Sequence, residues 1–226
     1  MRALVTRFIS LVIALSVVMP VSASALMARA QQYADEAGYE VFRNAKPVGD
    51  YLIRFRPQKD ALSIEVQMQI QAKIFGLFSY DYLYSATEIW RNDELDSLYV
   101  RMVTNGDEEI IRATREAEQL VVTDADGSVS EVPTNLITTH HWFDEILNQS
   151  KVLNTLNGRV SEIAVEREID QVWMIDGVPV NVTGFRLGGD LKNTLSWYDD
   201  EGLWRGMTFK ARDGSSIDVR WRGAEL

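Results

Sequence analysis

The chain has 226 residues and a formal net charge of −10, and hydrophobic residues make up 46% of it. This composition is typical of a globular protein with a substantial core, and it excludes disorder, collagen and coiled coil as the main state. The acidic balance argues against a nucleic-acid partner, because such binding depends on basic patches. Cysteine is absent, which excludes disulfide bonds, thiolate metal sites and a cysteine nucleophile.

The amino-terminal segment has the pattern of a cleaved secretory signal peptide. Arg2 and Arg7 form a short basic region, and an uncharged apolar run follows over residues 8–19. Ala23-Ser24-Ala25 then provides the small residues of a cleavage site, and Ala28-Arg29-Ala30 is a second candidate. The apolar run is too short to span a bilayer comfortably, so an uncleaved anchor is the weaker alternative.

We therefore divide the chain into a signal peptide, residues 1–25, and one β-rich domain, residues 26–226. We expect export to a bacterial periplasm and no transmembrane segment in the mature part, which holds no apolar run of spanning length. No linker, repeat or low-complexity stretch divides the domain further.

Residues 25–37 predict a short amphipathic helix, and most of the chain after it predicts strands. The best evidence is Leu62–Ile74, where apolar and polar residues alternate throughout, as in a strand with one dry and one wet face. Shorter alternating runs occur at residues 51–56, 80–84, 98–102, 195–197 and 207–211.

Tight-turn pairs punctuate these runs. Most are Asn-Gly or Asp-Gly, which tolerate positive φ, and they stand at 105–106, 126–127, 157–158, 176–177 and 213–214, with Gly188-Gly189 and Glu201-Gly202 in addition. Helix is scarce: Trp142–Gln149 predicts one or two turns, and Asn135–His141 predicts a loop.

The fold class that follows is mainly all-β. We expect a single strongly bent antiparallel sheet of about ten or more strands, forming a half-barrel or a barrel, with one or two short helices. The concave face of such a sheet either encloses a small apolar ligand or is filled by side chains, and the sequence leaves both alternatives open.

Five segments resemble, in their order and spacing, a bacterial exported family known as domain of unknown function 6134. They are Gly38–Gly49 (GYEVFRNAKPVG), Ala86–Leu95 (ATEIWRNDEL), Val132-Pro133 with Thr138–Trp142 (TTHHW), Leu153–Val160 (LNTLNGRV) and Leu195–Trp204 (LSWYDDEGLW). The resemblance implies a periplasmic β protein, more distantly similar to half-barrel lipoprotein-carrier folds, and it implies no activity. Thr-Thr-His-His-Trp departs from the Pro-Thr-Ser-Tyr-Trp type expected there.

Two apolar features are candidates for ligand contact. In Ile74-Phe75-Gly76-Leu77-Phe78 the alternation breaks, which predicts either a ligand gate or a bend that closes one end of the core. Aromatic side chains nearby can line a cavity or simply pack across strands. The candidate ligand-binding residues are Ile74, Phe75, Leu77, Phe78, Tyr80, Tyr82, Tyr84, Trp90 and Trp142.

The two histidines, His140 and His141, are the remaining candidates for chemistry. They could form an acid/base site with Asp144 or Glu145, or they could lie in a surface loop. Because a zinc site needs three or four ligands, we expect no metal. The sequence contains no nucleophile elbow and no phosphate-binding glycine loop, so we assign no catalytic residue and no cofactor.

Three functions remain open from the sequence. The first is a non-enzymatic carrier with an apolar or amphiphilic ligand, such as a lipid-like molecule, on the concave face. The second is a structural or interaction module that meets another envelope protein through an edge strand or an acidic face. The third and weakest is a hydrolase that uses His140 or His141.

Overall fold

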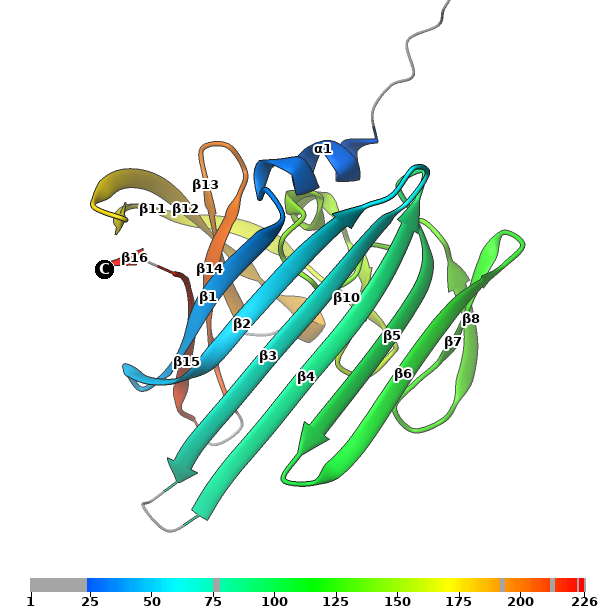
Figure 1. Cartoon of the computed structure of the whole chain (residues 1–226), viewed down its shortest axis with the longest axis horizontal. Coiled ribbons are helices and arrows are strands. Elements are labelled where there is room, and N and C mark those ends of the chain that lie inside the picture. Colours follow the sequence, from blue (N-terminus) through cyan, green and yellow to red (C-terminus); the bar gives the residue numbers. More distant parts are fainter. Residues whose placement is uncertain (1–23, 75–77, 192–193, 212–213, 223, 226) are drawn as a thin grey trace, which may run out of the picture.

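The computed structural model describes residues 24–74, 78–191, 194–211, 214–222 and 224–225. Within these residues, 14 strands form one antiparallel sheet, and two short strands, β9 and β10, form a separate pair. Figure 1 shows the sheet bent strongly, with helix α1 (Ala25–Gln32) across its upper end. The predicted all-β architecture is therefore confirmed.

The elements follow the chain in two groups around an irregular middle. The first group is β1 (Glu36–Arg43), β2 (Lys46–Pro57), β3 (Leu62–Ile74), β4 (Phe78–Arg91), β5 (Glu94–Thr104), β6 (Asp107–Glu116), β7 (Gln119–Thr123) and β8 (Val129–Pro133). The middle holds the 3-10 helix η1 (Asp144–Asn148), β9 (Lys151–Leu153) and β10 (Val160–Glu162). The second group is β11 (Val165–Ile175), β12 (Val178–Leu187), the 3-10 helix η2 (Gly189–Leu191), β13 (Thr194–Asp199), β14 (Trp204–Lys210), β15 (Ser216–Trp221) and β16 (Ala224–Glu225).

Strand β15 joins the two groups by pairing with β1, where Val41 lies opposite Val219. The strand order is therefore β16-β11-β12-β13-β14-β15-β1, followed by β2 to β8 in sequence. In the part of the chain that the structure describes, the two ends of this sheet do not pair with each other. The sheet is a half-barrel, and the closed barrel is not formed.

The alternation predicted for β3 sets which face is buried. Ile64 and Val66 are fully buried on the concave side, while Gln67 and Gln69 are exposed on the convex side. Burying one face of a strand makes its register costly to change, because a slip of one residue would turn every apolar side chain outward. Strands β2, β3 and β4 are therefore held in one register along their length.

Two-residue hairpin turns connect many of the strands. Asn92 and Asp93 have φ values of 52° and 63°, and Asn105 and Gly106 have 52° and 98°. Positive φ at both central residues defines the turn type whose twist matches that of the flanking strands. The turn expected from the sequence at Asn105-Gly106 is present in the structure.

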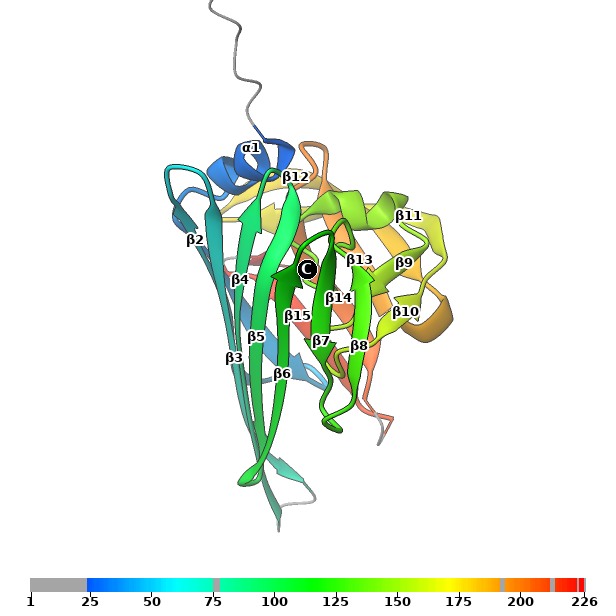
Figure 2. The ribbon, with the colours of Figure 1, turned by 90° about the vertical axis from the view of Figure 1, so that its right-hand side faces the viewer.

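A segment on the concave side fills the upper half of the half-barrel. We call residues 134–164 the interior segment; Figure 2 shows it with β9 and β10 beside the β7 and β8 edge. Its Trp142 is 1% exposed, with its ring 5.2 Å from that of Phe55 on β2. The Trp142 carbonyl also accepts a hydrogen bond of 2.8 Å from the Tyr33 hydroxyl. Side chains of the protein itself therefore occupy this half of the concavity.

Candidate functional site

A chain of buried polar groups connects β4 to the interior segment. The Tyr84 hydroxyl lies 2.7 Å from Nε2 of His140, and Nδ1 of His140 lies 2.8 Å from Oε1 of Glu88. The second carboxylate oxygen of Glu88 accepts a hydrogen bond of 2.9 Å from the Trp90 indole. Tyr84, Glu88 and Trp90 all project from the concave face of one strand, because they are separated by even numbers of residues.

The hydrogen bonds to the Glu88 carboxylate have a fixed direction. An ionised carboxylate only accepts, so Nδ1 of His140 donates to Glu88. Burial alone would raise the pKa of Glu88, but the adjacent His140 and hydrogen bonds from His140, Thr138 and Trp90 together hold that pKa below its ordinary value. Burial raises the pKa of Tyr84 well above its ordinary value, so its hydroxyl keeps the proton beside Nε2 of His140.

The neighbouring His141 points to the opposite wall of the half-barrel. Its Nδ1 lies 3.2 Å from the Ser196 hydroxyl on β13, and its ring stacks on Trp204 of β14 at 5.5 Å. The His141 carbonyl accepts a hydrogen bond of 2.9 Å from the Tyr198 hydroxyl. Burial, together with the charge of His140, lowers the pKa of His141 to about 4. This imidazole is therefore neutral at physiological pH.

The surface-loop alternative for the two histidines is wrong. His140 is 4% exposed and His141 is 7% exposed, and their hydrogen bonds reach opposite walls of the sheet. The expected partners lie elsewhere: Asp144 forms a salt bridge of 2.8 Å with Arg29, and Glu145 accepts hydrogen bonds from residues of its own turn. The two imidazoles hold the interior segment between the walls of the half-barrel.

Glu88 is the member of this cluster that the sequence analysis missed. Its signal was nevertheless present, since Glu88 occupies an inward position in the same alternation as Tyr80, Tyr82 and Tyr84. A carboxylate at a strand position that faces the apolar core is costly to bury unless it has charged or hydrogen-bonding partners there. Such a residue predicts a buried polar partner, although it does not identify His140 as that partner.

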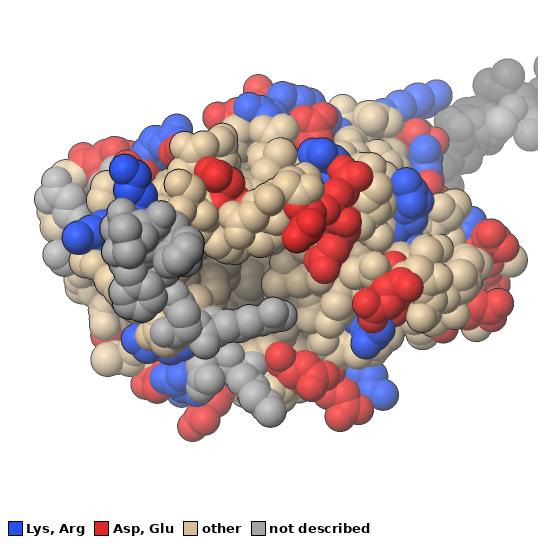
Figure 3. Space-filling view, turned by 90° about the horizontal axis from the view of Figure 1, so that it is seen from below, with Lys and Arg blue, Asp and Glu red and all other residues tan. Residues whose placement is uncertain are grey.

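The lower half of the concave face is less completely filled. Along the inward positions of β3, burial is complete at Ile64 and Val66 but only partial at Ala72. On β4, Tyr80 and Tyr82 are also partly buried, and their rings lie nearly parallel with centroids 6.4 Å apart. Figure 3, which views this lower end directly, shows a recess whose visible walls include many residues without charge.

The Tyr82 hydroxyl adds a polar group to this part of the face. Burial raises the pKa of Tyr82 well above its ordinary value, and the nearby Tyr80 and Glu109 act in the same direction. The hydroxyl therefore stays protonated and can both donate and accept a hydrogen bond. An aromatic ring with a hydroxyl suits contact with a molecule that has an apolar and a polar part.

The candidate ligand-binding residues thus fall into three groups. Tyr80 and Tyr82 lie at the lower, partly open end of the concave face. Tyr84, Trp90 and Trp142 are buried at 2%, 3% and 1% exposure, where they contact other parts of the protein. Phe75 and Leu77 lie outside the described residues, as do the side chains of Ile74 and Phe78, which end β3 and begin β4.

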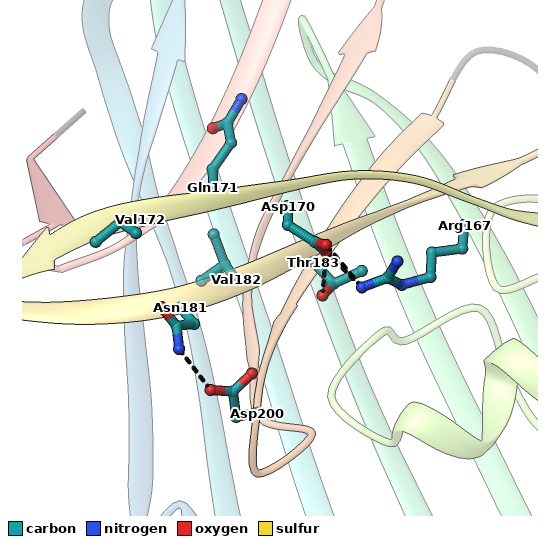
Figure 4. Close-up of a pocket in the computed structure, with 8 residues that line it drawn as sticks. All are labelled: Arg167, Asp170, Gln171, Val172, Asn181, Val182, Thr183 and Asp200. Carbon is teal, nitrogen blue, oxygen red and sulfur yellow. Dashed lines mark hydrogen bonds and ion pairs between the residues drawn. The ribbon is translucent and has the colours of Figure 1, made fainter.

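A shallow pocket on the β11–β12 hairpin is a different feature of the surface. Figure 4 shows Arg167, Asp170 and Thr183 turned toward one another and Asn181 turned toward Asp200, whereas Gln171 points away from them. Asp170 is bound by Arg167 and by the Thr183 hydroxyl at 2.8 Å, and Asn181 donates to Asp200 at 2.8 Å. Because these groups are already paired, the pocket offers few free partners to a ligand, and none of the candidate residues lines it.

The chain is similar to known proteins both in sequence and in fold. The sequence profile of a domain of unknown function, DUF6134, matches residues 39–222. The chain belongs to the DUF6134 family. Among solved structures, this DUF6134 protein is similar to a β-barrel-like protein of another domain of unknown function, DUF1849, from Brucella abortus. The TM-score is 0.59 at 11% identity, over 84% of this chain and 96% of the other, so the likeness shows the fold alone. No curated protein matches.

Two further observations concern the described residues of the DUF6134 protein. Across the described ranges, no helix is long and apolar enough to cross a membrane. In those same ranges, no three His, Asp or Glu side chains are grouped so that they could hold a metal ion.

Proposed function

We propose that this protein is a periplasmic, non-enzymatic carrier that holds an apolar or amphiphilic small molecule in the lower half of its bent sheet. The observation that carries the proposal is the recess at the lower end, which lies where inward-facing apolar side chains are left partly uncovered. Apolar side chains facing a concave, incompletely filled space are the usual lining of small-molecule sites.

The interior segment restricts where such a ligand can lie. Trp142 and Leu153 fill the upper concavity, so the ligand meets residues of the lower strand ends, including Ala72, Tyr80 and Tyr82. An acyl or isoprenoid chain would pack against the aliphatic and aromatic side chains, and a polar end group would reach the Tyr82 hydroxyl. The signal peptide pattern in the sequence supports the periplasmic location.

Direct identification of bound molecules tests the proposal. The protein would be exported by a bacterial host, purified without detergent and extracted with organic solvent, and the extract would be examined by mass spectrometry beside an unrelated exported protein. We expect a lipid-like molecule near one equivalent per chain that is absent from the control. Extracts indistinguishable from the control, together with no binding of a fluorescent fatty acid, would overturn the carrier function.

A second candidate, an envelope interaction module, has one observation in its favour. Strand β11 is close to an edge of the sheet, since β16 pairs only with Met174 and Ile175. The remainder of its outer side, around Ile169 and Val172, is bordered by no strand in the described chain, and these side chains are 45% and 63% exposed. An open edge with exposed apolar residues can accept a strand from a partner. Cross-linking in the envelope from residues on β11 would recover that partner.

A further inference from the structure

The start of helix α1 is bound to a single carboxylate from the β4–β5 turn. Asp93 accepts hydrogen bonds of 3.1 Å from the backbone N–H groups of both Ala25 and Leu26. The Ser24 hydroxyl also donates to Asp93. These residues are 67 to 69 positions apart in the sequence, so the contact depends on the tertiary structure.

The turn tolerates an aspartate at this position but does not require one. Asp93 has a φ of 63° at the second central residue, where other two-residue turns of this chain have Ala45, Gly106 and Gly177. Glycine is favoured there because other L-residues lose free energy at positive φ. Backbone conformation therefore does not select aspartate over alanine or glycine here, whereas the contacts of the Asp93 side chain all lie at the beginning of α1.

The burial of residues in α1 favours one of the two candidate cleavage sites. Leu26 and Ala30 are each 1% exposed and belong to the main core, and Arg29 forms a salt bridge of 2.8 Å with Asp144. Cleavage after Ala30 would remove all three residues and leave part of the core uncovered. Cleavage after Ala25 would keep them in the mature protein.

We propose that the signal peptide is removed after Ala25 and that Asp93 is the receptor for the amino terminus this creates. Cleavage would convert the Leu26 N–H, which already lies 3.1 Å from the carboxylate, into an ammonium group paired with Asp93. Hydrolysis of the bond between Ala25 and Leu26 consumes one water, which supplies the carboxylate of Ala25 and the amine of Leu26. The inference rests on the proposed export of the protein, and it is independent of whether a ligand is bound.

The mass of the exported protein tests the position of the cut. We expect a chain that begins at Leu26. A chain that begins at Ser24, at Gln31 or at Met1 would overturn the proposal. Because the ligand extraction described above does not depend on the position of the cut, failure of this proposal and failure of the carrier function are distinguishable.

The reactivity of the new amino group tests the role of Asp93. An ion pair with a carboxylate favours the protonated amine and slows its acylation, and each pKa unit lost raises the free-amine fraction about tenfold at neutral pH. We expect Asp93→Asn to speed acylation of the Leu26 amine several-fold at pH 7. Asparagine tolerates positive φ, so the turn is retained, and a cooperative thermal transition would verify that the variant is folded.

Asp176 supplies the matched control, since it lies in another hairpin turn with a φ of 50° and is exposed. Asp176→Asn should leave the acylation rate of the Leu26 amine unchanged. Equal rates in the wild-type protein and in folded Asp93→Asn would overturn the assignment of Asp93 as the receptor.

Discussion

The Nδ1 atom of His140 lies 2.8 Å from Oε1 of Glu88, although the two residues are 52 positions apart in the sequence. Both side chains are almost completely shielded from solvent. This pair connects the middle of the concave sheet to the interior segment. A histidine hydrogen-bonded to a carboxylate is also the arrangement found in catalytic bases. Here the pair is buried, so its contribution to the free energy of unfolding can be measured.

Replacing Glu88 by Gln should lower the free energy of unfolding by about 3 kcal/mol at pH 7, because one carboxylate oxygen becomes an NH2 group that cannot accept the buried hydrogen bond from His140 or from Trp90. Urea denaturation of the two proteins would measure the difference. Glu116→Gln, an exposed change on β6, should have an effect within about 0.5 kcal/mol. A Glu88→Gln variant as stable as the wild type would show that the pair contributes nothing net.

His141 should make the stability depend on pH between its unfolded and folded pKa values. The folded pKa is about 4 and the ordinary value is 6.5, so the unfolded chain binds the proton first as pH falls. The contribution of His141 to the free energy of unfolding is therefore fully present above pH 6.5. It declines by about 3 kcal/mol as the pH falls toward 4.

The variant His141→Phe isolates this contribution. The ring can still stack on Trp204, and the Ser196 hydroxyl keeps its hydrogen bond from the Trp204 indole. In urea denaturation at pH 7, 6, 5 and 4, we expect the wild type to lose more stability than the variant over this range. Parallel curves would mean that His141 is not the group responsible.

A bulky residue at Ala72 should block the proposed ligand site. Ala72 faces inward opposite Tyr80 and is partly buried, so Ala72→Trp would fill the space beside that ring. We expect the affinity for a fluorescent fatty acid to fall about tenfold or more, which corresponds to about 1.4 kcal/mol. Lys73→Trp, on the same strand but exposed on the outer face, should bind as the wild type does. Equal binding by both variants would place the ligand elsewhere.

Removing the Trp142 side chain should be the most destabilising change in the interior segment. The variant Trp142→Ala would leave a cavity against Phe55 and lower the free energy of unfolding by about 3–5 kcal/mol. Leu156→Ala, where the side chain is 54% exposed, should cost less than about 1 kcal/mol. Similar midpoints of thermal unfolding for the two variants would contradict the role of Trp142 in filling the concavity.

Much of the sheet could be predicted because its signals are local. The alternation in Leu62–Ile74 gives β3 with the predicted bounds and face, since side chains of a strand alternate between its two sides. Asn105-Gly106 and Asp176-Gly177 mark turns because their backbone conformations are favoured by those residues themselves.

The candidate site was less predictable, because its members meet only through packing. The aromatic alternation on β4 correctly placed Tyr80, Tyr82 and Tyr84 on one face, but it did not distinguish the open lower end from the filled upper half. That difference arises from the interior segment, whose position on the concave side is not encoded in any short pattern. The same holds for His140 and His141, which a local pattern could not assign to opposite walls.

The sequence by itself determined the strands, their faces, the tight turns and the presence of one small helix, because each depends on neighbouring residues and on backbone preferences. The tertiary structure alone decided that β15 pairs with β1, that Glu88 meets His140, and that Asp93 binds the beginning of α1. These contacts join residues far apart in the chain. Their free energy comes from burial and hydrogen bonding in the folded state, which no local window of sequence contains.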